Sequence, residues 1–398
     1  MSLFSAVEMA PRDPILGLNE QFAADTNPNK VNLGVGVYYD DAGKLPLLKC
    51  VQAAEAQIMG TPKARGYLPI DGIAAYDGAV KGLVFGSDSD VVTSDRVATI
   101  QAIGGTGGLK VGADFLRRMG ASKQVLISDP SWENHRALFV AAGFDVDTYP
   151  YYDAANRGIN FDGMLARLQT AAPGTIVVLH ACCHNPTGAN PSPELWAKVA
   201  DVLSLRGAIP FVDLAYQGFG DGLEADALAT RLIAARFPEV LIAASCSKNF
   251  GIYRERTGVL IALSEPSRKA VVQANLAYLN RQNFSFPPDH GARLVTMILE
   301  DPALCADWQA ELEEVRLNML TLRQSLAEEL RRATNSDRYD FVAHHRGMFS
   351  RLGITQAQVD QLRDTHGIYM VGDSRINIAG LNARTVPILA QAIAAVGG

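Results

Sequence analysis

The stretch Val240-Leu-Ile-Ala-Ala-Ser245-Cys-Ser-Lys248-Asn-Phe-Gly251 places a lysine shortly after an apolar run. The run predicts a buried β-strand, so Lys248 stands at a strand end beside two small hydroxyl residues. Partial burial would favour the neutral amine, the form that attacks an aldehyde to give a Schiff base. Ser245, Ser247 and the following Arg256 could hold a phosphate. The alternative is an ordinary surface lysine just past a strand, and this stretch alone leaves both interpretations open.

Apolar runs of the same kind recur along the chain. They cover residues 97–103, 124–128, 145–152, 175–182, 209–214, 240–245 and 258–263, with helical patterns between most of them. Strands and helices in alternation predict an α/β fold with a mostly parallel sheet covered on both faces. In such sheets ligands bind at the carboxyl ends of the strands, so the residues just after each run are the candidate site.

The last quarter of the chain has a different pattern. From Trp308 to Leu330 the apolar residues recur at steps of three and four, which predicts one face of a long amphipathic helix. Short β-like runs and a helix at 385–396 follow. We therefore expect a large domain at 46–312 and a smaller α/β domain formed by 1–45 and 313–398.

Composition and charge restrict the class of protein. The chain has 398 residues, 48% hydrophobic and 20% charged, with a net charge of −6 and no basic block. This is typical of a soluble globular protein that does not bind nucleic acid. The sequence has neither a run approaching the roughly 18 apolar residues of a membrane helix nor a signal-peptide pattern. Five cysteines without framework spacing predict reduced thiols in a cytoplasmic protein.

The segment His180-Ala-Cys-Cys-His184 contains residue types that bind metals. Its spacing matches no zinc pattern, and it reads as a strand that runs into a turn. We therefore expect no metal site.

Different side chains follow the other runs. The segment Gly104-Gly-Thr-Gly-Gly108 opens a helix, where free N–H groups and the helix dipole favour an anion. Trp132 and Asn185 follow two further runs, and Asp213 ends a third run with Tyr216 just beyond it. The tryptophan could cover a cofactor ring or belong to the core. A carboxylate at a buried strand end is costly unless a positive group pairs with it.

One cofactor accounts for all five strand ends. Pyridoxal 5′-phosphate needs a lysine for its aldehyde, an anion cradle for its phosphate and a carboxylate that keeps its ring nitrogen protonated. A phenol and an amide can bind the phenolate oxygen of the ring, and an aromatic side chain can cover the ring face. Any purely structural explanation would need five separate coincidences.

Longer motifs carry a resemblance to a known family. Asn185-Pro-Thr-Gly188, Asp213-Leu-Ala-Tyr-Gln-Gly218, Ser245-Cys-Ser-Lys-Asn-Phe-Gly251 and Ser374-Arg-Ile-Asn-Ile-Ala-Gly380 resemble the aspartate/aromatic branch of the class I aminotransferases. The similarity runs from near Pro14 to the C-terminus. Within that branch, Asn280-Arg-Gln-Asn-Phe-Ser-Phe-Pro-Pro288 is most similar to the bacterial aromatic-amino-acid aminotransferases. The resemblance implies fold type I, with a seven-stranded sheet in which 258–263 would be the one antiparallel strand.

The resemblance also implies roles toward the cofactor. Lys248 would bind the aldehyde and move the substrate proton. Asp213, supported by His135, would pair with the ring nitrogen, and Tyr216 with Asn185 would hold the phenolate oxygen. Trp132 would stack on the ring. The phosphate would be held by Gly105, Thr106, Ser245, Ser247, Arg256 and, from a second copy of the chain, Tyr67.

Other matching residues would bind the substrate. Arg375 would clamp the α-carboxylate, with Gly36, Trp132 and Asn185 nearby. Arg281 of a second copy would meet the distal carboxylate of a dicarboxylic substrate. Activity would then require a homodimer, because each site is built from two chains.

The chain departs from the aspartate-specific pattern of the branch. Phe286 stands where aspartate aminotransferases typically carry asparagine, and Tyr39, Leu45 and Gly66 replace polar residues near the entrance. These changes make the pocket more apolar, which suits an aromatic side chain.

We therefore expect a cytoplasmic, homodimeric, pyridoxal-phosphate-dependent aminotransferase that acts on aromatic amino acids and on glutamate or 2-oxoglutarate. The nearest alternative is a dicarboxylate-preferring aspartate aminotransferase. A nucleotide-binding oxidoreductase would use residues 104–108 as its phosphate loop, but the glycine spacing is wrong and Lys248 would have no task. A catalytically silent cofactor-binding domain should have lost reactive groups, and none is missing.

Overall fold

The computed structural model describes residues 3–9, 14–40, 42–62 and 64–398. Contacts within the chain divide it into two units. The larger unit consists of Pro46–Leu320 and His345–Gly347, and the smaller unit consists of the residues up to Leu45, Thr321–His344 and Met348–Gly398. The boundary between Leu320 and Thr321 lies inside helix α12 (Pro302–Thr334). It is eight residues beyond the boundary expected at 312.

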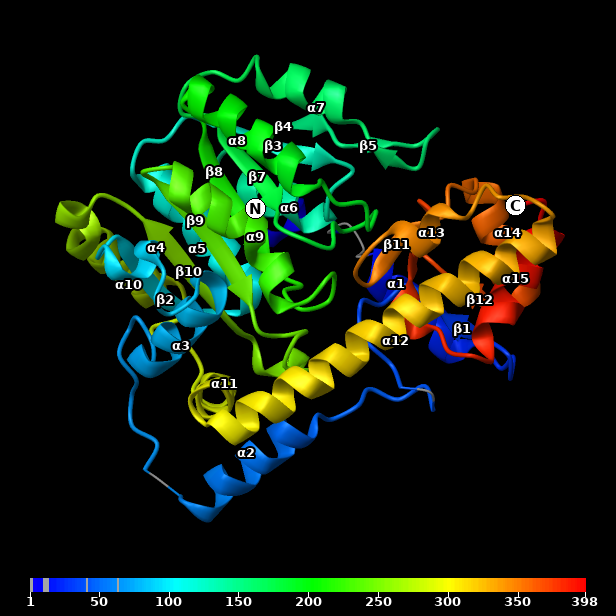
Figure 1. Ribbon diagram of the computed structural model, residues 1–398, viewed down its shortest axis with the longest axis horizontal. Coiled ribbons are helices and arrows are strands. Elements are labelled where there is room, and N and C mark those ends of the chain that lie inside the picture. The colour runs from blue at the N-terminus through cyan, green and yellow to red at the C-terminus, as the bar shows by residue number, and fades with distance from the viewer. Residues whose placement is uncertain (1–2, 10–13, 41, 63) are drawn as a thin grey trace. The chain divides into compact units, whose positions relative to one another are not determined.

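A seven-stranded sheet forms the centre of the larger unit within the described residues, in the order β2-β10-β9-β8-β7-β3-β4 (Figure 1). Strand β10 pairs antiparallel with both of its neighbours, and the other adjacent pairs are parallel. The α/β fold and the single antiparallel strand are thus confirmed. The strands are β2 (Val97–Ile103), β3 (Gln124–Asp129), β4 (Asp145–Pro150), β7 (Ile176–His180), β8 (Ile209–Leu214), β9 (Val240–Ser245) and β10 (Thr257–Leu263).

Helices cover both faces of this sheet (Figure 1). Helices α5 (Gly104–Arg118), α6 (Glu133–Ala141) and α10 (Lys269–Asn283) pack on one face, where Leu109, Phe139 and Leu276 join strand residues such as Ile100 and Phe211 in one buried cluster. Helices α8 (Pro193–Arg206) and α9 (Leu223–Arg236) lie on the opposite face. Because both faces are covered, the central strands β7, β8 and β9 are buried and apolar along most of their length, whereas the edge strand β4 is not.

Local sequence fixes where these helices begin and end. Before α8, the Ser192 Oγ accepts a hydrogen bond from the Leu195 N–H at 3.4 Å, and Pro193 occupies the first helical position. A serine cap satisfies an otherwise unpaired N–H, and proline has no N–H to lose there. Gly207 ends the helix with a φ of 60°, a left-handed conformation that suits glycine.

The register of the parallel strands aligns several functional side chains. His180 of β7 lies opposite Asp213 of β8, and Asp213 lies opposite Ala243 of β9, two residues before Ser245. The carboxyl ends of these three strands therefore meet at one edge of the sheet, and the segments that follow them start together.

The smaller unit has its own core. Strand β1 (Val31–Asn32) pairs parallel with β12 (Ile368–Tyr369), and β11 (Phe349–Arg351) pairs antiparallel with β13 (Arg375–Asn377). Leu326 and Leu330 of α12 pack there with Leu389 and Ile393 of α15 (Thr385–Ala395).

The remaining elements are short or peripheral. They are η1 (Leu3–Ala6), α1 (Pro14–Ala24), α2 (Lys49–Gly60), α3 (Ala74–Phe85), α4 (Asp90–Thr93), β5 (Tyr152–Asp153), β6 (Gly158–Ile159), α7 (Phe161–Leu168), η2 (Tyr253–Glu255), η3 (Pro266–Arg268), α11 (His290–Glu300), α13 (Phe341–His344), α14 (Gln356–His366) and η4 (Ile378–Gly380). Across the described ranges of the chain, none of the helices combines the length and apolar character that a membrane crossing demands.

Candidate active site

Lys248 follows β9 and is surrounded by groups that control its charge. Its Nζ lies 4.9 Å from the centroid of the Tyr216 ring. Burial lowers the pKa of the Lys248 amine, and the nearby charge of Arg256 lowers it further, against the opposing attraction of Asp213. The neutral, nucleophilic form of the amine is therefore more accessible than in water, as an aldehyde-binding lysine requires.

Asp213 is paired with a buried histidine. His135 Nε2 lies 2.8 Å from Asp213 Oδ2, and the His135 side chain is wholly buried on α6. Burial by itself would raise the pKa of Asp213, but the hydrogen bond from His135 and the charges around it more than offset burial and leave the pKa below its ordinary value. Asp213 is therefore a carboxylate in the neutral pH range.

A chain of hydrogen bonds continues behind this pair. His135 Nδ1 lies 2.9 Å from Ser131 Oγ, Ser131 Oγ lies 3.2 Å from His180 Nε2, and the backbone N–H of Asn185 donates to His180 Nδ1 at 3.4 Å. Burial lowers the pKa of His180 to about 3, so its ring is neutral. Because Nδ1 accepts from a backbone N–H, Nε2 carries the ring proton.

Two directions in this chain are determined. His180 Nε2 donates to Ser131 Oγ, and His135 Nε2 donates to the Asp213 carboxylate, which has no proton to give; Ser131 Oγ links the two histidines. Ser131 and His180 were not predicted as residues of this site. His180 lies opposite Asp213 in the register of β7 and β8. A residue-by-residue alignment of these two strands would therefore have placed His180 beside Asp213.

The N-terminus of α5 has the features of an anion cradle. Gly105 and Ser245 are in contact, since a Cβ on Gly105 would lie 3.2 Å from Ser245 Cβ. A Cβ on Gly104 would lie 2.5 Å from Arg256 Nη2, and one on Gly258 would lie 2.7 Å from the Gly104 carbonyl carbon. The backbone contact at Gly258 and the positive φ of Gly104 both favour glycine, and the close packing brings a guanidinium and a serine to the first N–H groups of a 15-residue helix.

Two other predicted phosphate ligands lie beside this cradle. Thr106 is in the first turn of α5, and the Ser247 N–H donates to Ser245 Oγ at 3.2 Å. The donor set of hydroxyls, helix N–H groups and a guanidinium fits a phosphate.

The predicted ring-binding residues have intermediate or low exposure. Asn185 and Tyr216 are each 7% exposed. Trp132 packs on the core cluster and keeps part of its surface accessible, and its ring lies edge-on to His135 at 5.3 Å between centroids. The core interpretation and the cofactor interpretation of Trp132 are therefore compatible, since the side chain packs on the core cluster and is still partly accessible.

Two further predicted residues of the larger unit, Tyr67 and Phe286, are in contact, and Arg281 lies near Phe286 in the sequence. Tyr67 is 92% exposed, and its ring lies 5.3 Å from that of Phe286. Arg281, exposed near the end of α10, donates from Nη1 to Ser285 Oγ. Gly66 beside Tyr67 has open space around its Cα.

The remaining predicted substrate residues belong to the smaller unit. Arg375 is 3% exposed, donates from Nη2 to the Gly34 carbonyl at 2.8 Å, and holds its Cζ 4.5 Å from the Phe349 ring centroid. A Cβ on Gly36 would lie 2.6 Å from Phe349 Cζ, so only glycine fits against that ring. Burial raises the pKa of Tyr39, whose N–H donates to the Ala379 carbonyl, while Leu45 is 44% exposed.

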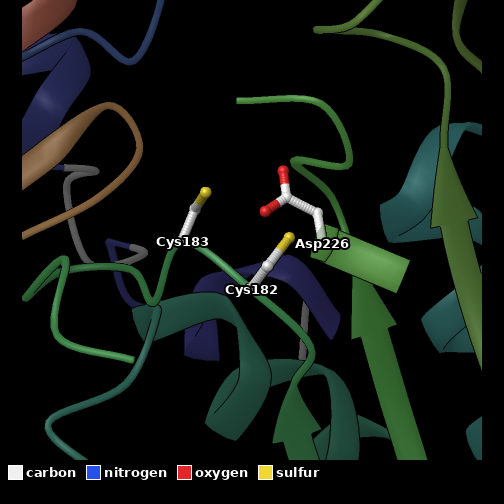
Figure 2. A group of neighbouring side chains, drawn as sticks. All are labelled: Cys182, Cys183 and Asp226. Atoms are coloured by element: carbon white, nitrogen blue, oxygen red, sulfur yellow. The ribbon is translucent and has the colours of Figure 1, made fainter. Parts of the chain in front are cut away.

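The two cysteines of the 180–184 segment, Cys182 and Cys183, lie near the carboxylate of Asp226 (Figure 2). Their ligand atoms all lie within 4.8 Å of one another. The Asp226 carboxylate, however, accepts backbone N–H bonds from Gly218, Gly220 and Asp221 at 2.9, 2.9 and 3.0 Å. Its observed task is therefore to hold the turn that follows Tyr216.

Comparisons with known proteins place this geometry in a family. Residues 28–393 match the family model "Aminotransferase class I and II". The chain belongs to this family. It is similar to the aromatic-amino-acid aminotransferase of Paracoccus denitrificans, with 52% identity over 97% of both chains. It is also similar to the aspartate aminotransferase of Pseudomonas aeruginosa, with 50% identity over 99% of both chains.

A solved structure agrees with this aminotransferase over its full length. The aromatic-amino-acid aminotransferase of Burkholderia pseudomallei, determined covalently bound to pyridoxal phosphate, is 54% identical to it, with a TM-score of 0.97 and complete coverage of both chains. The fold of this aminotransferase, both units included, is thus that of a pyridoxal-phosphate-dependent transferase.

Proposed function

We propose that the chain is a pyridoxal-phosphate-dependent aminotransferase that moves the amino group of an aromatic L-amino acid to 2-oxoglutarate in two half-reactions. One observation carries the proposal. An amine with a lowered pKa at Lys248, a carboxylate held ionised at Asp213 and an anion cradle at residues 104–106 lie at the carboxyl ends of strands of one sheet. Each group meets a separate chemical need of that cofactor.

The residues divide the work of holding the cofactor. Gly105, Thr106, Ser245, Ser247 and Arg256 bind its phosphate, and Trp132 covers its ring. Asp213, kept ionised and oriented by His135, binds the ring nitrogen as an N–H⁺. Tyr216 and Asn185 donate to the phenolate oxygen. When bound, the cofactor supplies an aldehyde that accepts the amino group and a ring that stores the electron pair left at the substrate Cα.

Lys248 has two tasks in this proposal. Its neutral Nζ first holds the cofactor aldehyde. Once substrate has displaced it, Nζ takes the proton from the substrate Cα and returns it to the carbon that receives the amino group. An amine whose pKa lies closer to neutrality than that of free lysine is suited to both directions of transfer.

Two arginines hold the carboxylates of the substrate in this proposal. Arg375, next to Gly36 in the smaller unit, binds the α-carboxylate through two parallel hydrogen bonds. Arg281 of a second copy binds the distal carboxylate of glutamate or 2-oxoglutarate. The exposure of Tyr67 on the single chain suits a tyrosine that completes the phosphate site of a partner, and we propose a homodimer on this ground.

Two observations favour aromatic donors. Phe286 lies against Tyr67 and offers apolar surface. Tyr39 of the smaller unit is a further aromatic side chain among the predicted substrate residues. The relative from P. denitrificans is named for aromatic substrates. The aspartate aminotransferase of P. aeruginosa is similar to the chain to nearly the same extent. A dicarboxylate-preferring aspartate aminotransferase is therefore the second candidate. A cytoplasmic location accords with the reduced cysteines.

A visible absorption spectrum tests the proposal. The cofactor-loaded protein should show a band that bleaches when L-phenylalanine or L-tyrosine is added and returns with 2-oxoglutarate. L-aspartate, titrated in parallel, distinguishes the two candidates by the concentration that bleaches half of the band. A band that no amino acid changes would overturn the assignment.

A further inference from the structure

Helix α12 carries an arginine that the stripe of apolar residues does not require. Arg323 is 0% exposed and sits between Leu322 and Leu326, which also face the core of the smaller unit. A buried guanidinium is costly unless its N–H groups are satisfied, and an aliphatic side chain would fill such a position without that cost. The arginine therefore calls for an explanation other than packing.

Its hydrogen bonds converge on one strand. Arg323 Nη2 donates to the Phe349 carbonyl at 2.8 Å, and Nη1 donates to Ser350 Oγ at 2.8 Å and to the Val342 carbonyl at 3.0 Å. Two of these acceptors belong to consecutive residues of β11. The planar, forked guanidinium thus fixes both the position and the direction of that strand from the helix side.

The strand so fixed carries a ring that touches two predicted substrate residues. The Phe349 ring lies under the Arg375 guanidinium, 4.5 Å from Cζ to centroid, and its tip abuts Gly36. Strand β11 also pairs directly with β13, which begins at Arg375. Arg375 in turn donates to the Gly34 carbonyl. Displacement of β11 would move the ring, the arginine above it and the glycine segment together.

We propose that Arg323 is a positioning residue for the substrate α-carboxylate, acting through Phe349 on Arg375 and Gly36. The inference rests on the proposed function, because it takes Arg375 as the carboxylate ligand. A two-pronged guanidinium–carboxylate pair needs accurate placement, so a loosened β11 weakens it.

A matched pair of substrates isolates this role. L-phenylalanine and 2-phenylethylamine differ only in the α-carboxylate, and the rate at which each bleaches the cofactor band in a single turnover can be compared. In Arg323→Met the preference for phenylalanine should fall by about tenfold or more, the scale expected for slight misplacement of a binding group. Arg331→Met is the control, since Arg331 is an exposed arginine of the same helix, paired with Asp340. It should leave the preference unchanged.

Three further variants make each outcome decisive. Arg375→Leu should abolish the preference, and if it does not, the proposed role of Arg375 fails. If Arg375→Leu abolishes it while Arg323→Met behaves like Arg331→Met, the positioning role alone fails. Phe349→Leu and Arg323→Met combined should lower the preference less than the product of their separate effects, because they act along one path. Should Arg323→Met not fold, Ser350→Ala must give a smaller loss of the same preference, and an unchanged preference there overturns the inference.

Discussion

His135 Nε2 lies 2.8 Å from Asp213 Oδ2, and the other ring nitrogen of His135 is held by Ser131. The histidine is fixed at both ends, so it can present only its Nε2–H to the carboxylate. Asp213 thereby keeps its charge in a buried setting and keeps its second oxygen, Oδ1, for a ligand.

Asp213→Asn should therefore lower kcat while the fold is retained. The amide has the same shape but cannot keep the ring nitrogen of the cofactor protonated. We expect a loss on the order of 100-fold or more, comparable with the removal of an acid–base group. Steady-state kinetics with phenylalanine and 2-oxoglutarate measure it, with Asp201→Asn, an exposed partner of Arg236, as the control. An unchanged kcat would mean that Asp213 does not face the ring nitrogen.

Lys248→Ala should abolish turnover and still bind the cofactor through its phosphate contacts. Loss of the group that moves the proton should cost several orders of magnitude, roughly 10²–10⁴ for the proton transfer alone. Dialysis and cofactor titration measure retention, and Lys269→Ala, an exposed lysine paired with Asp95, provides the comparison. Near-native turnover by Lys248→Ala would refute the assignment of Lys248.

The lowered pKa of Lys248 also predicts a dependence of stability on pH. The folded, cofactor-free chain disfavours the charged amine, so below the folded pKa the lysine costs stability. That cost diminishes as pH rises through the folded pKa toward 10.5, the ordinary lysine value, where the unfolded chain also loses its proton.

Lys248→Met should therefore be more stable than the parent protein near pH 7, by an amount that shrinks as pH approaches 10.5. Urea unfolding of both cofactor-free proteins at equal concentration measures the difference, and Lys269→Met corrects for loss of an exposed charge. If the difference in unfolding free energy does not vary with pH, the charged form of Lys248 does not destabilise the folded chain.

Substitutions of Arg281 and Phe286 should have opposite effects on the preference between dicarboxylic and aromatic substrates. Arg281→Leu should cut kcat/KM for aspartate and glutamate severely and leave phenylalanine nearly unchanged, because only dicarboxylates need the guanidinium. Phe286→Asn should act in the opposite sense, since the apolar contact of an aromatic side chain is worth roughly 2–3 kcal/mol when buried. If Arg281→Leu lowers kcat/KM equally for dicarboxylic and aromatic substrates, Arg281 does not act on the distal carboxylate alone, and the proposed division of roles between Arg281 and Phe286 is wrong.

Mixed dimers test whether Arg281 serves the partner's site. Lys248→Ala chains and Arg281→Asp chains are mixed and allowed to exchange subunits. A heterodimer would carry one site with both residues intact, so activity on dicarboxylic substrates should rise above that of either variant. No rise, with exchange confirmed by mass, would place Arg281 in the site of its own subunit.

The sequence predicted the central sheet well for a physical reason. Buried parallel strands must be apolar along their length, so β8 and β9 stand out as continuous runs with the bounds expected. The short strands of the smaller unit have no such continuous apolar run. Strand β1 is only two residues long: beyond it, Asn32 Oδ1 accepts from the Gly34 N–H, and Asn377 Nδ2 donates to the Val35 and Val37 carbonyls.

By itself, the sequence determined the α/β fold, the family motifs and the chemical types that follow each strand, because those depend on local pattern and residue chemistry. Only the tertiary structure decided which partners control them. The chain from His180 through Ser131 to His135 joins three segments and fixes the charge of Asp213. The bonds from Arg323 to β11 join residues 26 and 27 positions apart. Neither follows from periodicity, because hydrogen bonds between distant segments depend on register and packing, which exist only once the chain has folded.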